Sequence, residues 1–147
     1  MNRSQRRLVL ATYVRLLRVA NAARVHAGRH LAGTGLTLTQ FAVLEALYHL
    51  GPMSLSDIAQ KILTTGGNLT MVVGNLEKQD LAHRQQSPED RRVLIVVLTA
   101  KGKLLIRRLF PEHAAGIAEF MAALSPAEQE QLGDLCRKLG QQDLAAS

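Results

Sequence analysis

The sequence predicts a mainly α-helical domain that carries one small β-hairpin, and three observations lead to this fold class. Hydrophobic residues make up 47% of the 147 residues, which is enough apolar material to fill a core. Aromatic residues make up only 3%, so Leu, Val, Ile and Ala must supply most of that core. Apolar residues recur at helical spacing along most of the chain, whereas the β-branched run at 93–98 is typical of a strand.

The first helix is predicted over residues 5–31. Apolar residues such as Tyr13 and Leu17 recur there at helical spacing and give the helix one apolar face. Gly33 and Gly35 end it, because glycine disfavours the helical backbone. We therefore expect a long helix whose apolar side packs against another element.

Two shorter helices are predicted next. The first runs from Thr37 to Leu50, where Gly51-Pro52 stops it. The second ends near Leu63 and begins at Ser54 or Ser56, because a serine hydroxyl can accept a hydrogen bond from the first helical N–H groups.

The fourth helix is predicted to have two distinct faces between its cap, Thr65, and Gln79. Leu69, Val72 and Leu76 share its apolar face. The opposite face carries small, polar or flexible residues: Asn68, Thr70, Met71, Gly74 and Asn75. Glycines at 66 and 67 weaken the start of this helix by roughly 1 kcal/mol each, and close approach of the backbone to a bulky partner would explain them.

A two-stranded hairpin follows. Its strands are predicted near 83–86 and 93–98, and the turn Ser87–Asp90 joins them. Its tip carries three charged residues in a row, Asp90, Arg91 and Arg92.

Two further helices complete the chain. One begins at Thr99 and continues through Pro111, which kinks it rather than ending it. The other runs from a Ser125 cap to about Gly140, with proline at its first position and an acid in its first turn.

The order helix, helix, helix, hairpin over residues 36–102 is that of a winged helix-turn-helix, a fold suited to duplex DNA. A helix fits the major groove, and a hairpin tip with arginine can enter the neighbouring minor groove. The formal net charge of +6 agrees with a polyanionic partner, and residues 1–44 contain seven arginines and no acidic residue.

The cysteine count, the hydropathy and the motifs of the sequence indicate where the protein acts and which functions are excluded. The single Cys136 excludes an internal disulfide and a cysteine-built zinc site, and its apolar neighbours in the last helix predict that it is buried. The longest strongly apolar run, 93–98, is far too short to cross a membrane, so we expect a cytoplasmic protein without a membrane partner. No phosphate loop, nucleophile elbow or recognisable pair of catalytic carboxylates occurs in the sequence, so we expect neither an enzyme nor a bound cofactor.

Several motifs between Leu38 and Gly102 make the sequence similar to the MarR family of bacterial transcriptional regulators. The most specific is the Asp90-Arg91-Arg92 wing followed by Leu98-Thr99-x-x-Gly102. The others are Leu38-Thr39-Gln40-Phe41-x-Val43-Leu44, Gly51-Pro52, Leu55-Ser56-x-Ile58-Ala59, and Gly67-Asn68-Leu69-Thr70 through Leu76-Glu77. The flanking helices match in length and place, so the resemblance covers nearly the whole chain as one domain, 1–147.

The resemblance implies a homodimer that binds a roughly palindromic DNA operator and usually represses transcription until a small ligand releases it. It places the dimer contacts in 5–33 and 103–141. It places Arg92 in the minor groove, oriented by Asp90 and accompanied by Arg91. Further DNA-contact positions carried over are Thr39, Gln40, Ser54, Ser56, Thr65, Gly66, Gly67, Asn68, Thr70, Met71 and Asn75.

The fourth helix departs from the family pattern. Many members carry Lys or Arg where Gly66, Met71 and Asn75 stand here, so this helix is uncharged until Lys78. We therefore expect contacts from polar side chains and from Met71 to a thymine methyl, with heavier reliance on the wing and on DNA shape.

The effector site is predicted by the resemblance alone, between the DNA-binding lobe and the dimer helices. Residues expected to line it are His26, His30, Phe41, Tyr48, Phe110 and His113. The segments 36–52 and 88–92 also resemble members that respond to phenols or quinones. A zinc-responsive regulator of the same fold is the alternative, because His26 and His30 lie one helical turn apart and His49 and His113 stand in predicted helices that could approach that face. A winged-helix module that binds RNA or protein also remains open, since this fold serves such roles.

Overall fold

The computed structural model describes residues 1–62 and 66–144, and of 66, 67 and 142–144 it describes only the backbone. This part of the chain contains six α-helices, one short 3-10 helix and a three-stranded antiparallel sheet. It divides into two compact units, Ala27–His113 and a second formed by Met1–His26 with Ala114–Ser147. Among the helices described, none is long and apolar enough to cross a membrane.

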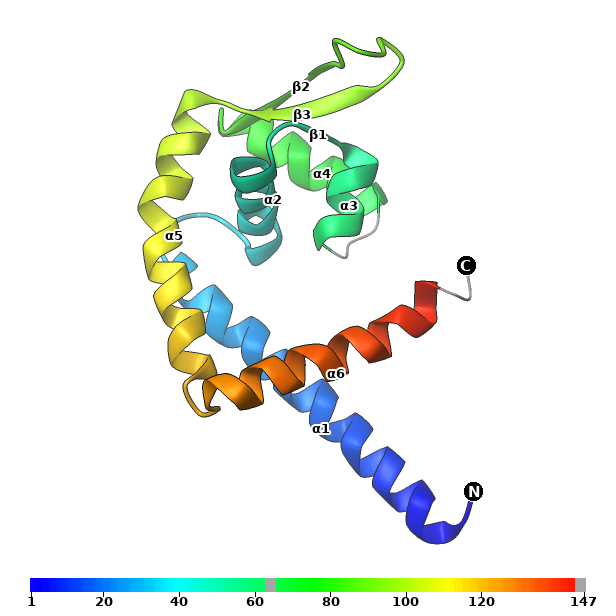
Figure 1. Cartoon of the computed structure of the whole chain (residues 1–147). Helices are drawn as coiled ribbons and strands as arrows, with labels where there is room; N and C mark the ends of the chain where they lie inside the picture. The colour runs from blue at the N-terminus through cyan, green and yellow to red at the C-terminus, as the bar shows by residue number, and fades with distance from the viewer. Residues whose placement is uncertain (63–65, 145–147) are drawn as a thin grey trace. The chain divides into compact units, whose positions relative to one another are not determined.

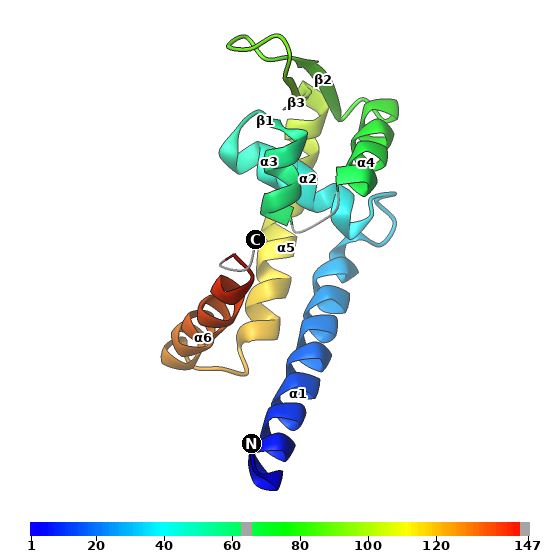
Figure 2. The ribbon, with the colours of Figure 1, turned by 90° about the vertical axis from the view of Figure 1, so that its right-hand side faces the viewer.

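The unit Ala27–His113 contains a helical cluster beside a small sheet. Helices α2 (Leu38–Leu50), α3 (Leu55–Ile62) and α4 (Gly66–Lys78) pack against one another, and strands β2 (Ala82–Gln86) and β3 (Leu94–Leu98) form a hairpin that extends beyond them (Figures 1 and 2). The short strand β1 (Met53–Ser54) pairs with β3 on the side opposite β2, so the sheet order is β1-β3-β2. The winged helix-turn-helix predicted from the order of elements is confirmed.

The core of this unit joins every element of the helical cluster to the sheet. Its side chains are almost entirely aliphatic, as the low aromatic content predicted, and Phe41 is the aromatic residue among the largest fully buried ones. The fully buried members are Phe41, Val43, Leu44, Ile58, Leu69, Val73, Leu76, Val96 and Ile106. Burial of Leu69, Val73 and Leu76 fixes which face of α4 points inward, so its remaining side is left at the surface.

A capping box begins α2 and a glycine ends it. The Thr37 hydroxyl accepts a hydrogen bond from the Gln40 N–H at 3.1 Å, and the Gln40 side-chain oxygen accepts one from the Thr37 N–H at 2.9 Å. At the other end, Gly51 takes a φ of 83°, which residues with a Cβ rarely adopt.

The start of α5 (Ala100–Met121) holds the turn between α4 and β2, and we call these contacts the α5 brace. The hydroxyl of Thr99 donates to the Asp80 carbonyl at 2.7 Å, and Nζ of Lys101 donates to the Gln79 carbonyl at 2.8 Å. A Cβ added to Gly102 would lie 2.0 Å from the Leu81 carbonyl oxygen, so only glycine permits this approach. The brace gives a physical reason for the Leu-Thr-x-x-Gly motif.

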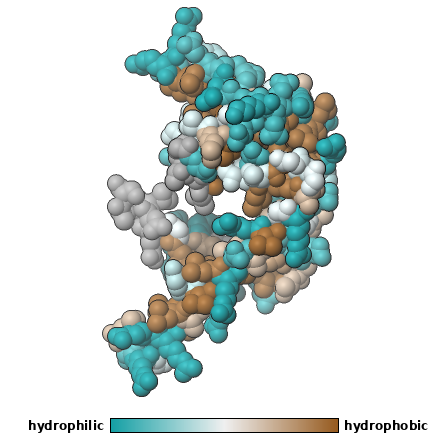
Figure 3. All heavy atoms as spheres, turned by 180° about the vertical axis from the view of Figure 1, so that it is seen from behind, coloured by the Kyte–Doolittle hydropathy of each residue, from teal (hydrophilic) through white to brown (hydrophobic). Residues whose placement is uncertain are grey.

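The second unit is helical. It contains most of α1 (Arg3–Gly28), the end of α5 and α6 (Pro126–Leu144). Ser125 caps α6: its N–H and hydroxyl both donate to the Glu128 carboxylate, and these bonds lower the pKa of Glu128. No residue of α1 is buried in the single chain, and its exposed apolar side chains include Val9, Tyr13, Leu16 and Leu17. Figure 3 shows such apolar surface in brown.

The structure corrects three expectations. The sheet has three strands rather than two, because the two residues of β1 are too few to show an alternating pattern. The first helix ends at Gly28 and the chain continues as the 3-10 helix η1 (Arg29–Leu31). Cys136 is exposed rather than buried, and no residue of 126–141, the part of α6 whose burial is described, is buried. In contrast, α5 continues through Pro111 as predicted.

Candidate nucleic-acid interface

Helix α4 presents a surface face of small, nearly uncharged side chains. Asn68, Thr70 and Met71 are exposed, and 62% of Met71 is accessible. Asn75 is half-buried on the next turn. Gly66 and Gly67 form the first residues of the helix, and Thr65, the expected cap, lies outside the described residues. The exposed face can therefore offer amide and hydroxyl groups and one thioether to a partner.

The contact residues expected at the starts of α2 and α3 differ in their exposure and hydrogen bonds. Ser54 caps α3: its hydroxyl accepts the Asp57 N–H at 3.1 Å and donates to the Asp57 carboxylate at 2.8 Å. Ser56 is exposed and Thr39 is half-buried. Gln40 is buried and its side-chain oxygen is used by the capping box of α2, so its placement here is that of a structural residue.

The tip of the hairpin orients an arginine by two parallel hydrogen bonds. Nε and Nη2 of Arg92 each lie 3.1 Å from a different oxygen of Asp90, and the Arg92 N–H donates to the same carboxylate at 3.1 Å. These bonds from Arg92 hold the pKa of Asp90 below its usual value. The side chain of Arg92 is nevertheless 89% exposed, and Arg91 beside it is exposed as well. The hairpin thus offers a pre-oriented guanidinium at its tip.

An ion pair between Glu77 and Arg84 connects α4 to the base of the hairpin. Nε of Arg84, on β2, donates to the Glu77 carboxylate on α4, and both side chains are about one-third exposed, at 32% and 31%. In the sequence, Glu77 stands out only as part of the motif that ends in Leu76-Glu77. Since Arg84 lies seven residues away and across a turn, no periodic pattern pairs the two.

A second cluster in the same unit brings two histidines onto one phenylalanine. The ring centroids of His30 and His113 lie 4.5 Å apart, and those of Phe41 and His113 lie 4.6 Å apart. His113 is buried, and its Nε2 lies 4.0 Å from the Glu45 carboxylate. Within the described part of the chain, His30 Nε2 and His113 Nδ1 are buried without a hydrogen-bond partner. Burial and the neighbouring His113 lower the pKa of His30.

The other expected effector residues are only partly assembled around this cluster. The ring centroid of His49 lies 5.1 Å from that of Tyr48 and 4.8 Å from that of Phe110, and Glu45, which lies near the cluster, was not expected there. Glu45 follows Phe41 by four residues, about one turn of α2, and this spacing could have suggested it. His26 lies outside this unit: it and Phe120, whose ring centroids are 5.4 Å apart, both belong to the unit formed by Met1–His26 with Ala114–Ser147. No three His, Cys, Asp or Glu side chains in residues 1–62 and 66–144 are grouped to hold a metal ion, so the zinc alternative gains no support.

Comparisons with known proteins show which family this architecture resembles. The model of the MarR family matches residues 36–94, a segment that contains every contact residue expected from α2 to the wing. The chain is 40% identical over 131 residues to the HTH-type transcriptional regulator MhqR of Bacillus subtilis, covering 89% of this chain and 90% of that protein.

Two solved structures illustrate the structural similarity. BpsR of Bordetella bronchiseptica, whose DNA binding is regulated by 6-hydroxynicotinic acid, is 28% identical, with a TM-score of 0.76 and coverage of 85% and 89% of the two chains. AbsC of Streptomyces coelicolor, a MarR family transcriptional regulator, is 21% identical with a TM-score of 0.85, covers 100% of this chain and 98% of that one, and supports the fold.

Proposed function

Because the chain belongs to the MarR family of transcriptional regulators, we propose that it binds a specific double-stranded DNA operator as a homodimer and represses transcription until a small ligand releases it. The observation that carries this proposal is the clamp between Asp90 and Arg92 at the hairpin tip. A forked pair at the end of a hairpin fixes an arginine that contributes nothing to the core. Such an arginine suits insertion into the minor groove, where negative potential is strong.

In this proposal α4 lies in the major groove and reads bases without charge. Asn68 and Thr70 contact base edges, and the exposed Met71 contacts a thymine methyl. Phosphate contacts come from the helix starts at Ser54, Ser56 and Thr39, from Gly66 and Gly67 at the N-terminal end of α4, and from Thr65, which precedes them in the sequence. Asn75 lies at the edge of this surface. Gln40 is left out because it is buried in the capping box.

The homodimer is supported by apolar surface that the single chain leaves uncovered. In α1, Val9 is 55% exposed, Tyr13 56% and Leu17 52%, all on the face that the helical spacing predicted. On α6, Leu135 and Leu139 are each 55% exposed. An apolar stripe of this length is typical of a subunit interface. Residues 5–33 and 103–141 would supply the contacts, and the two half-sites would lie about 10 bp apart.

The ligand is proposed to bind at the cluster of His30, Phe41 and His113. Two buried ring nitrogens without partners can accept or donate hydrogen bonds to a hydroxyl or carbonyl group, and Phe41 offers a ring face for stacking. A phenolic or quinone-like compound combines these features. The DNA binding of the relative BpsR is regulated by 6-hydroxynicotinic acid, which is a hydroxylated aromatic compound.

Binding to DNA from the region flanking the protein's own coding sequence tests the proposal. Fluorescence anisotropy with a labelled duplex, at physiological salt and with random duplex as competitor, measures specificity rather than charge attraction alone. We expect saturable binding with one dimer per palindrome, and loss of binding when a phenol or quinone is added. Equal affinity for the flanking and random duplexes would show that the chain is not a specific repressor of its own region.

A further inference from the structure

An open groove runs along the first turns of α5, apart from the histidine cluster. It has a volume of about 330 Å³, and its lining residues all belong to the unit Ala27–His113: Leu81, Lys101, Leu104, Leu105 and Arg108. A volume of this size lies at the lower end of the range of ligand pockets, about 300–1,000 Å³. None of the features assigned above to DNA or to the aromatic ligand uses it, and of its lining residues Leu104, Leu105 and Arg108 fall within the segment 103–141 proposed for the dimer.

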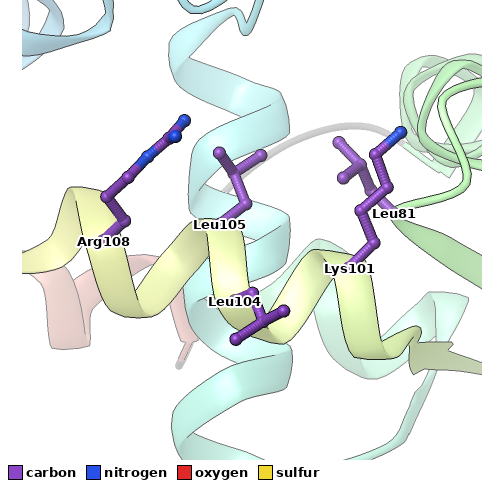
Figure 4. A pocket seen from close by; sticks show the side chains of 5 residues that line it. All are labelled: Leu81, Lys101, Leu104, Leu105 and Arg108. Carbon is purple, nitrogen blue, oxygen red and sulfur yellow. The ribbon is translucent and has the colours of Figure 1, made fainter.

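The groove combines an apolar floor with two cations. Leu81 is buried and Leu105 is half-buried, whereas Leu104 is 66% exposed at the rim. Figure 4 shows Arg108 and Lys101 on either side of Leu105, with Leu81 beside Lys101. These two cations are seven residues apart, two helical turns, which separates them by roughly 10 Å along the axis. The lining contains no acidic residue.

We propose that this groove binds a small amphipathic carboxylate. Its apolar body would lie on the leucines, where water is released from surface that is otherwise exposed. Its carboxylate would pair with Arg108, because a guanidinium matches a carboxylate with two parallel hydrogen bonds. A neutral apolar compound would not pair with Arg108, and a simple anion would leave the leucines uncovered.

Lys101 has a second, structural role that distinguishes it from Arg108. Its Nζ already donates to the Gln79 carbonyl at the end of α4, as part of the α5 brace. A substitution of Lys101 would therefore disturb α4 as well as the groove. Arg108 lines the groove outside the brace, so it is the cation whose removal tests ligand binding.

Isothermal titration calorimetry of the full chain with octanoate, without DNA, tests the site. Octanoate carries both charge and apolar body, octanamide lacks the charge, and acetate lacks the body. We expect saturable octanoate binding that is weaker for both comparison compounds. Arg108→Gln should weaken it about fivefold, a modest value because the pair is exposed. The control Arg107→Gln removes an exposed cation that does not line the groove and should leave binding within about twofold of wild type.

Two results would overturn the proposal. One is the absence of saturable octanoate binding. The other is octanoate binding that Arg108→Gln leaves unchanged or that Arg107→Gln weakens equally, since the ligand would then sit elsewhere or be held by general charge. Thermal unfolding of both variants confirms that each is folded before titration. Because no DNA is present, failure here leaves the proposed regulator function standing, and failure of operator binding leaves this site standing.

Discussion

Replacing Arg92 separates the contribution of the wing to DNA affinity from its contribution to the fold. Its guanidinium is held by Asp90 alone among its described partners and is 89% exposed, so Arg92→Ala should leave the thermal unfolding temperature unchanged. An arginine that reads DNA contributes about 1–3 kcal/mol. The proposed dimer has two wings, so the total loss is about 2–6 kcal/mol, which is a Kd weaker by about 25-fold or more at about 1.4 kcal/mol per tenfold.

Two further variants sharpen this experiment. Arg92→Lys keeps the charge but loses the fork, so it should recover only part of the affinity. Arg137→Ala is the matched control, because Arg137 is also an exposed arginine paired with an aspartate, at 2.9 Å from Asp134; since it lies in the segment proposed for the dimer, size-exclusion chromatography first shows that this variant keeps the wild-type oligomeric state. Anisotropy with the operator duplex measures all three. Wild-type affinity in Arg92→Ala, or an equal loss in Arg137→Ala, would refute the assignment of Arg92 to the minor groove.

Three other predictions concern the fold around the site. Gly102→Ala should lower the unfolding temperature clearly, because its Cβ would meet the Leu81 carbonyl at 2.0 Å, whereas Gly74→Ala, with open space around it, should raise stability by about 0.5–1 kcal/mol; equal effects in thermal melts would contradict the brace. The lowered pKa of His30 means that the unfolded chain binds its proton more readily, so stability should be full above about pH 6.5 and fall as the pH drops below it. This loss should shrink in His30→Gln and persist in the control His83→Gln, and identical pH profiles would argue against it. Glu77→Gln should weaken operator binding several-fold with little change in helix content by circular dichroism, and the charge-reversed double variant Glu77→Arg with Arg84→Glu should restore part of the affinity; no recovery would show that the ion pair does not position the wing.

Periodic features of the sequence were sufficient to predict most of the DNA-binding unit. The apolar spacing of Leu69 and Leu76 defined the buried face of α4, and that burial is confirmed. The β-branched run ending at Leu98 predicted β3. These predictions succeed because a helix or strand imposes its period on every core residue it contributes.

Features that depend on contacts between distant segments were not predictable in the same way. Strand β1 has two residues, so it has no period, and it exists because β3 offers an unpaired edge beside Met53. The pairing of Glu77 with Arg84 and the approach of Glu45 to His113 join different elements. Gln40 carries a polar side chain that a DNA-binding surface could use, and local capping decides its role instead. Cys136 has apolar neighbours in the sequence, but those neighbours, Leu132, Leu135 and Leu139, are themselves exposed.

The α5 brace has a consequence for exchanging the DNA specificity of this protein. Its acceptors are the main-chain carbonyls of Gln79, Asp80 and Leu81, and every amino acid supplies a carbonyl. The chemical requirement therefore falls on the hydroxyl of Thr99, the ammonium of Lys101 and the missing Cβ of Gly102, and not on the side chains of α4. The exposed residues of α4 can be replaced together, for example by those of another DNA-binding protein, while the brace keeps the helix in its original orientation. In this fold, the exposed side chains of α4 would determine which sequence is bound, whereas the α5 brace determines how α4 is oriented.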